Sequence, residues 1–275
     1  GANTTGDANL SVARRSYVDV RTGERILNGV VILAALGFVG GPMLATVASG
    51  LEADLGRLAG EAAVHRATLT SLVFATLSAT LACALSLSLV MARHALAAAR
   101  AGDKRPLLEK MTDTGAGLVL VVPPVVVGAG WFVLVRQGVD VFALAPVMVV
   151  TVNAVMAMPF AVRAIRPAHD AAAERHERLC AQLGIAGWSR LRLIDWPVLR
   201  RPLATAFAFA AALSLGDLGV IALFGSDAVQ TLPYLLLARM GSYRTADAAG
   251  LALMLGLLCL VLVMLADRLG KETSR

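Results

Sequence analysis

The chain has few residues of the types that perform catalysis, and their spacing matches no reaction centre. The cysteines form no C-x-x-C pair, the histidines are not paired at ligand spacing, and neither H-E-x-x-H nor G-x-x-x-x-G-K-[ST] occurs. We therefore expect no catalysis, metal or cofactor in this chain, and we interpret the histidines as solvated loop residues. The cysteines are Cys83, Cys180 and Cys259, and the histidines are His65, His94, His169 and His176.

Three polar side chains could instead act on a solute, because they stand in strongly apolar surroundings: Asn153, Ser214 and Asp217. A carboxylate near the centre of a membrane helix costs roughly 2.5–3.5 kcal/mol on insertion scales, so Asp217 should face protein or water. It could contact a cation on a path across a membrane, or it could be a structural carboxylate bonded to backbone groups. Asn153 carries the same two alternatives, and we include Ser214 in the candidate path.

The elements that must position these residues are six apolar stretches. Of the 275 residues, 57% are hydrophobic and 16% charged, and mean hydropathy is +0.72. A helix needs about 20 residues to cross a bilayer, and each stretch is about that long. The six predicted spans are Ile26–Gly50, Ala67–Ala92, Thr114–Val135, Val141–Val162, Pro202–Phe224 and Ala248–Ala266.

Helices explain these stretches better than strands, because the runs are continuous in Leu, Ala, Val and Gly, whereas barrel strands alternate apolar and polar residues. We predict an all-α polytopic membrane protein with a six-helix domain over residues 26–270. Residues 1–25 are polar and are predicted to form an N-terminal cytoplasmic segment or linker, and residues 271–275 a cytoplasmic tail. Pro123 and Pro124 should kink or break the third helix.

The placement of basic residues predicts the orientation. If loops alternate between the two sides, 20 of the 25 Lys and Arg residues fall on one side, which holds both termini and the loop between the fourth and fifth spans. Since cytoplasmic loops are enriched in Lys and Arg, this side should be the cytoplasm. The basic pI near 9.8 is then a topology signal, and we do not expect nucleic-acid binding.

The loop at residues 163–201 has a definite pattern. Residues 171–183 favour a helix, and Gly184 follows where a left-handed cap would end it. Trp188 and nearby apolar residues suggest a second short amphipathic segment, and Pro197 and Pro202 flank the start of the fifth membrane helix. The product is a helix–turn–helix projection with a basic rim and an apolar tip that includes Leu179, Cys180 and Leu183. A hairpin lying on anionic lipid and ordinary intramolecular packing are the alternatives.

This loop resembles the EAA loop of ABC-importer permeases, in which a glycine is followed by a hydrophobic residue and a proline. Here Pro197 lies 13 residues after Gly184, and Ile194 occupies the hydrophobic position. The Glu-Ala-Ala positions are occupied by Arg178, Leu179 and Cys180, so a salt bridge made by the family's glutamate has no direct equivalent.

The stretch from about Leu179 to Arg244, including FAFAAALSLGDLGVIALFGS and TLPYLLLARMGSYR, is similar to the C-terminal half of thiamine and thiamine pyrophosphate ABC permeases. The resemblance implies a type I ABC importer permease fold in a bacterial inner membrane. It implies that the loop docks on a cytoplasmic ABC ATPase dimer, which uses the ATP. It also implies a second permease half, fused or separate, and a periplasmic or extracellular solute-binding protein. Asp217 would then be a candidate contact for a cationic thiazolium.

Two other function classes stay open at the level of sequence. The same fold could carry ferric iron or another small solute, which binding assays with the soluble receptor would distinguish. A non-transport membrane module would not co-purify with a nucleotide-binding subunit.

Overall fold

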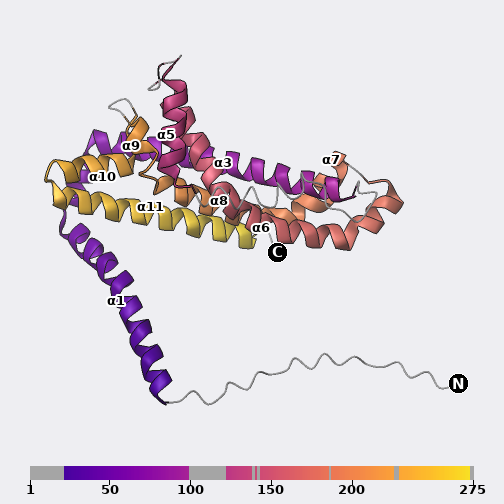
Figure 1. Cartoon of the computed structure of the whole chain (residues 1–275), viewed down its shortest axis with the longest axis horizontal. Helices are drawn as coiled ribbons and strands as arrows, with labels where there is room; N and C mark the ends of the chain where they lie inside the picture. The colour runs from indigo at the N-terminus through magenta and orange to yellow at the C-terminus, as the bar shows by residue number, and fades with distance from the viewer. Residues whose placement is uncertain are drawn as a thin grey trace. The chain divides into compact units, whose positions relative to one another are not determined.

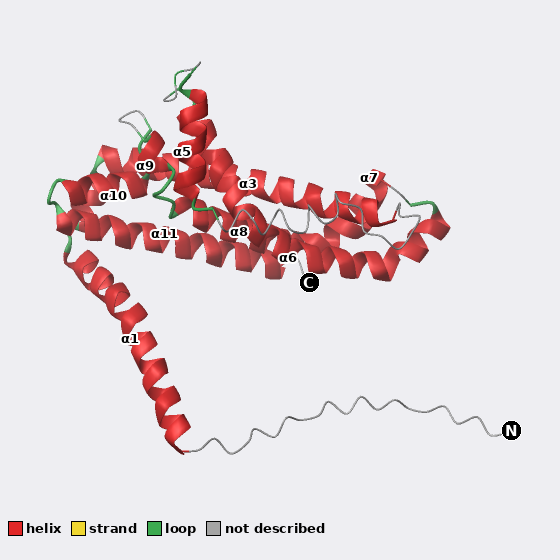
Figure 2. Cartoon of the chain, in the orientation of Figure 1, coloured by secondary structure: helices red, strands yellow, loops and turns green. Residues whose placement is uncertain are grey.

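The computed structural model describes residues 22–98, 122–137, 140, 143–185, 187–225 and 229–272 (Figure 1). Every element assigned in these ranges is helical, as the colouring of Figure 2 shows. The elements are α1 (Thr22–Glu52), α2 (Leu55–Gly60), α3 (Ala62–Ala98), α5 (Pro124–Val135), α6 (Ala145–Leu183), α7 (Gly187–Arg190), the π-helix η2 (Leu191–Asp195), α8 (Trp196–Leu215), α9 (Ile221–Phe224), α10 (Leu232–Gly241) and α11 (Thr245–Glu272).

The chain divides into two units, residues 1–45 and residues 46–275. The described part of the first unit is the larger part of α1, a helix of 31 residues whose mean hydropathy reaches 2.2. At about 1.5 Å per residue it is about 46 Å long, which exceeds the hydrocarbon thickness of about 30 Å.

The second unit is a bundle in which α3, α6, α8 and α11 run side by side (Figure 1). Its centre is built from alanines because small side chains let helix backbones approach closely in a membrane. This central cluster consists of Ala75, Ala79, Ala82, Ala154, Ala157, Ala210, Ala211 and Leu215, with side chains of α11 against it.

Larger side chains close both ends of the bundle. At the end that carries α7, which we call the knob end, Val90, Ile165 and Leu199 form the centre of a buried cluster. At the opposite end, which we call the far end, α10 packs on α3 and α11 through Leu232, Leu235 and other residues. The sequence analysis did not predict α10, because its ten residues are too short to stand out as a span.

The fold class is confirmed: the protein is all-helical and polytopic. By length and composition, five described helices could cross a membrane: Thr22–Glu52, Ala62–Leu96, Ala145–Leu183, Gly187–Leu215 and Thr245–Leu265. The predicted span Thr114–Val135 is described only from residue 122 onwards, where Pro124 begins the 12-residue helix α5. The break predicted at Pro123 and Pro124 is therefore present, with Pro124 at the start of the helix rather than inside it.

Two predicted boundaries were wrong. The fourth span does not end at Val162, because α6 continues without interruption to Leu183 and makes residues 163–170 helical. The fifth span is not one helix to Phe224, because α8 ends at Leu215 and the chain turns at Gly216 before the short helix α9. Of the predicted termini, residues 1–21 and 273–275 lie outside the described residues, and α11 extends to Glu272.

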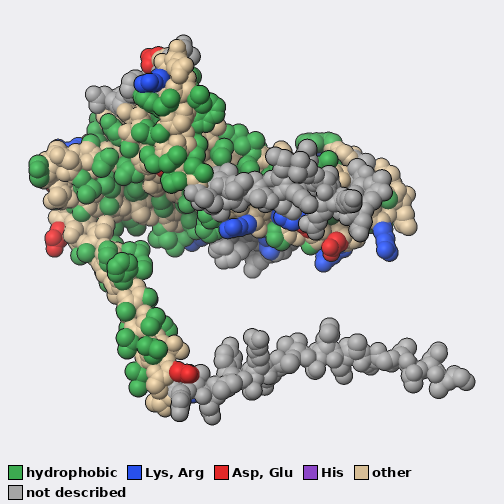
Figure 3. Space-filling model, viewed as in Figure 1, with side chains coloured by type: hydrophobic (Ala, Val, Ile, Leu, Met, Phe, Trp, Pro, Cys, Tyr) green, Lys and Arg blue, Asp and Glu red, His purple; other side chains and the backbone are tan. Residues whose placement is uncertain are grey.

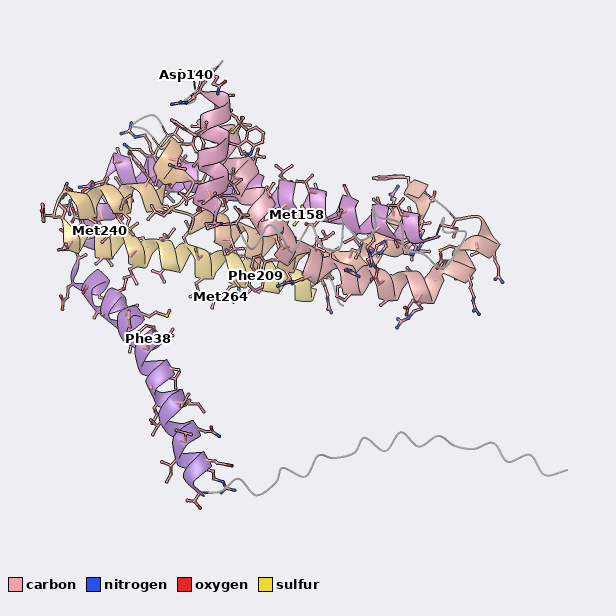
Figure 4. All side chains as sticks on the ribbon, viewed as in Figure 1. Phe38, Asp140, Met158, Phe209, Met240 and Met264 are labelled. Carbon is pink, nitrogen blue, oxygen red and sulfur yellow. The ribbon has the colours of Figure 1, made fainter. Side chains whose placement is uncertain are left out.

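The outside of the bundle agrees with a membrane location. Phe209 of α8 and Met264 of α11 point away from the bundle (Figure 4), and more than half of each side chain is exposed. On the face shown in Figure 3, Lys and Arg side chains gather at the knob end, whereas hydrophobic side chains cover the far end. Apolar exposure along the helices, with charged side chains at the knob end and a charged network at the far end, is the pattern expected where lipid gives way to water on both sides.

Candidate functional site

The segment at residues 163–201 is built as two rigid arms joined by a tight turn. The first arm is the last part of α6, and the second passes through α7 and η2 directly into α8. The predicted first short helix is thus the end of a 39-residue helix that begins at Ala145. This continuity was not predicted because the three charged residues Arg163, Arg166 and Asp170, together with Pro167, resemble a loop.

Gly184 ends α6 in the left-handed conformation, as predicted, with φ 65° and ψ 21°. Its N–H and that of Ile185 both donate to the Cys180 carbonyl, the latter at 2.9 Å. These two hydrogen bonds satisfy a carbonyl that the helix end would otherwise leave unpaired. A second left-handed glycine, Gly187 at φ 57°, starts α7 and was not predicted. The two glycines reverse the chain within four residues.

The outer surface of the turn is apolar. We call Leu179, Leu183, Trp188 and Leu193 the tip, because each is at least half exposed and Trp188 reaches 74%. Exposed apolar side chains gathered at one place on a protein usually mark a contact surface.

Of the remaining predicted residues, Arg178 and Pro197 are exposed and Ile194 is half-buried. Cys180 corrects the prediction, because it is only 3% exposed and faces the bundle. Cys180 points about 100° away from Leu179 around the helix axis, which turns it onto the face of α6 that is covered.

A buried carboxylate supports the turn from inside. Asp195, at the end of η2, is 4% exposed, and the Nε of Arg190 lies 3.8 Å from its Oδ2. Leu199, one turn further along, is buried in the knob-end cluster. These contacts hold the second arm to the bundle while leaving the tip free of it. Sequence analysis missed Asp195, since a lone aspartate in a basic segment resembles a solvated residue.

A second polar cluster joins α3 to α6 next to this segment. The Arg93 guanidinium donates to Asp170 Oδ2 at 2.8 Å, and the Nε of Arg166 lies 3.6 Å from the same oxygen. The rings of His94 and His169 meet edge to face, with centroids 5.2 Å apart. The interpretation of the histidines as solvated loop residues was wrong, because all four lie in α3 or α6 and only His65 is exposed; His169 is only 4% exposed.

The three polar residues predicted for a path lie together where α8 ends. Asn153 Nδ2 donates to Ser214 Oγ at 3.1 Å, and the side chain of Asn153 also bonds the Asp217 carboxylate. That carboxylate accepts from the backbone N–H groups of Gly219 at 3.1 Å and Val220 at 3.3 Å. Because several of its lone pairs are used by the turn before α9, the geometry favours the structural alternative for Asp217. A role of the three residues in a path stays a prediction.

A charged network that the sequence did not predict lies at the far end. Arg57 pairs with Glu61 and Asp247, Arg239 pairs with the same two carboxylates, and Arg244 also pairs with Asp247. Arg57 lies on α2, Arg239 on α10 and Asp247 at the start of α11, so these three meet only in the fold. Glu61 and Arg244 are each local to one of their partners. Asp247 is 8% exposed, and a buried carboxylate with three arginine partners ties these elements together.

Among the residues that the structure describes, no group of three or more His, Cys, Asp and Glu side chains could hold a metal ion.

Helices long enough to span a membrane, together with a projecting turn of exposed apolar residues, define a polytopic membrane component with a docking surface. The family described as "Binding-protein-dependent transport system inner membrane component" matches residues 94–274, about two thirds of the chain. The chain belongs to this family, and the multi-pass inner-membrane location follows from the same match and from the apolar helices.

Three relatives of this chain are transport system permease proteins. The chain is 60% identical over 254 residues to the thiamine transport system permease protein ThiP of Brucella abortus, covering 92% of this chain and 46% of that protein. It is 36% identical to the ThiP of Escherichia coli, covering 91% and 46%. A putative 2-aminoethylphosphonate transport system permease protein, PhnV of Salmonella paratyphi A, is 27% identical over 56% of this chain and 58% of that protein. The chain spans about half the length of the thiamine permeases that it matches.

Proposed function

We propose that this chain forms one half of the transmembrane path of an ABC importer for thiamine and its phosphates. The observation that carries the proposal is the identity of 60% to a thiamine permease over 92% of the chain. The other half of the path would come from the part of the relatives that the chain does not cover, fused or as a separate polypeptide. A solute-binding protein on the outer side would deliver the cargo.

We propose further that the tip docks on a separate cytoplasmic ABC ATPase dimer, which hydrolyses the ATP. The length of α6 supports docking on protein rather than on lipid. From Val162, where the apolar part of α6 ends, to Leu183 is 21 residues, or about 31 Å of helix. The polar headgroup region is only about 5–7 Å thick on each side. A helix that runs roughly along the bilayer normal therefore places the tip beyond the headgroups.

The form of the segment also suits the transmission of force. The tip sits on two helices that continue into the bundle, α6 and α8, with no flexible loop between tip and bundle among the described residues. Movement of the docked ATPase would therefore displace membrane helices directly. A lipid-surface hairpin would not need such stiff connections.

Reconstitution tests the proposal. The full-length permease that contains this chain is assembled with its ATPase and binding protein in proteoliposomes, and uptake of labelled thiamine is measured with and without ATP. We expect ATP-dependent uptake that unlabelled thiamine pyrophosphate competes away and that 2-aminoethylphosphonate and ferric iron do not. Uptake of either competitor with equal efficiency would refute the cargo assignment. Uptake without any bound ATPase would refute the coupling assignment.

A further inference from the structure

The cytoplasmic part of α3 is joined to the arm that carries the tip by a compact set of contacts. Arg93 and Asp170 form an ion pair at 2.8 Å, in which the side chains are 19% and 34% exposed. Next to it, His94 packs edge to face on His169, and His169 Nδ1 lies 3.7 Å from Asp170 Oδ1. We call these four residues the clamp.

The clamp differs in kind from the rest of the α3–α6 interface. Along the middle of the bundle the two helices meet through Ala75, Ala79 and Ala82 on α3 and Ala154 and Ala157 on α6. Such small side chains let the two backbones approach closely, so this part of the interface is held by apolar packing alone.

A specific polar connection in the middle is Ser86, whose Oγ lies 3.2 Å from the Met158 carbonyl. A neutral hydrogen bond of this kind contributes less than a charged pair does. Towards the knob end the interface gains the larger apolar side chains of Val90 and Ile165 and then the charged and aromatic contact of the clamp.

The clamp lies where it can transmit a displacement of the tip from α6 to α3. Asp170 lies on α6 between the membrane part of that helix and the tip, 13 residues before Leu183. Displacement of the tip that travels along α6 therefore reaches the clamp before the alanine interface.

From this arrangement we infer that the clamp is a positioning element that makes α3 move together with α6 when the ATPase displaces the tip. Arg93 and Asp170 touch neither the ATPase surface nor the cargo path; they act through the two helices. The inference rests on the proposed function, since it assigns the route by which ATP-driven displacement of the tip reaches α3 in addition to α6 and α8. Without the clamp, only apolar packing and the Ser86 hydrogen bond connect α3 to α6, and a larger share of the hydrolysis proceeds without transport.

The test is a double-mutant cycle in the full-length permease assembled with its ATPase and binding protein. The variants are Arg93→Ala, Asp170→Ala, the double variant and the charge-preserving Arg93→Lys. Arg163→Ala is the matched control, because Arg163 is an exposed arginine of α6 two turns before Asp170. The quantities measured are ATPase recovery, the hydrolysis rate and thiamine molecules imported per ATP.

We expect ATPase recovery to stay at the wild-type level, because the tip is untouched. Import per ATP should fall about fivefold in each single alanine variant, the scale of a partly buried ion pair acting on a conformational equilibrium. The double variant should be no worse than either single one, Arg93→Lys should recover most of the ratio, and Arg163→Ala should not change it. Additive losses in the double variant, or a normal ratio in both single variants, would overturn the inference.

A second measurement separates the clamp from the proposed function, because it needs neither ATPase nor cargo. Nitroxide labels at the exposed positions Ala95 and Glu174, in a background without native cysteines, report the distance between α3 and α6 near the clamp. We expect a narrow distance distribution in the parent protein and a broad one in Asp170→Ala. Equal widths would refute the clamp even if transport of thiamine is established, and failure of thiamine transport would leave the expected broadening unchanged.

Discussion

Replacing Gly184 with a residue that carries a Cβ should weaken docking of the ATPase without affecting membrane insertion. The left-handed backbone at φ 65° costs a residue with a Cβ about 1–2 kcal/mol relative to glycine. A Cβ built at Gly184 meets no atom within 4 Å, so steric overlap adds nothing to this cost. The perturbation is therefore purely conformational, and its size can be stated in advance.

The strain is relieved when the turn leaves the left-handed conformation, which rotates α7 and η2 and separates Trp188 and Leu193 from the α6 part of the tip. If only the native turn binds the ATPase, a cost of 1–2 kcal/mol lowers the apparent affinity by at most about 5- to 30-fold. Valine should be worse than alanine, because a β-branched residue fits this backbone region poorly. Asparagine tolerates the region and should remain close to the parent protein.

The assay is recovery of the ATPase by detergent-solubilised permease as a function of ATPase concentration, at equal membrane expression. Gln182→Val is the control, since it places the same side chain at an exposed position of right-handed helix two residues earlier. The expected order of affinity is parent, Asn, Ala and Val at position 184, with Gln182→Val near the parent. If Gly184→Asn is as poor as Gly184→Val, backbone strain is not the cause. If Gly184→Val binds and transports normally, the coupling assignment is wrong.

Three further predictions follow from other parts of the molecule. Reporter fusions after Ser242 should report the outer side and fusions after Arg275 the cytoplasm, and a cytoplasmic Ser242 would reverse the topology. Asp217→Asn should keep assembly and lower transport only modestly, because an amide oxygen replaces one acceptor of the two backbone bonds; a steep loss of thiamine uptake in a normally assembled complex would instead assign the carboxylate to the cargo. Gly250→Ala should lower thermal stability by about 1–3 kcal/mol through overpacking, since its Cβ would lie 2.6 Å from Leu58 Cδ1 and 3.0 Å from Ala53 Cβ. Gly256→Ala on the same helix, where a Cβ meets nothing within 4 Å, should have no effect, and equal melting temperatures for the two variants would contradict the packing argument.

The features that sequence predicts best are those that one local physical requirement determines. Long apolar runs must become helices in lipid, because only helices satisfy their own backbone groups there. A glycine after a helix-forming run predicts a left-handed cap, and Gly184 has this conformation. Pro124 similarly begins α5, where its missing N–H has no cost.

The features that sequence did not predict depend on what packs against what. The sequence places Cys180 in an apolar tip, because it does not show which face of α6 packs on other helices; in the structure Cys180 lies on the covered face. The sequence suggests that His169 and Asp195 are solvated, whereas packing between α3, α6 and α8 buries both side chains in the structure. The end of α8 at Gly216 has no strong local signal, since glycine is common inside membrane helices. In the structure, Asp217 stabilises the turn by capping the backbone that follows.

The placement of helix interruptions relative to the tip indicates how displacement would be distributed. Both arms are uninterrupted helix from the tip into the bundle, and α8 ends at Leu215, 22 residues after Leu193 of the tip. At about 1.5 Å per residue this is about 33 Å, roughly the hydrocarbon thickness of a bilayer. Helices bend most readily where hydrogen bonds are already missing, which here means Pro159 and Pro167 in α6, Pro202 in α8 and the end of α8 at Gly216. Displacement of the tip should therefore be absorbed at these points. Gly216 is the one beside Ser214 and Asp217, so polar residues of the candidate path lie where the bundle can change shape.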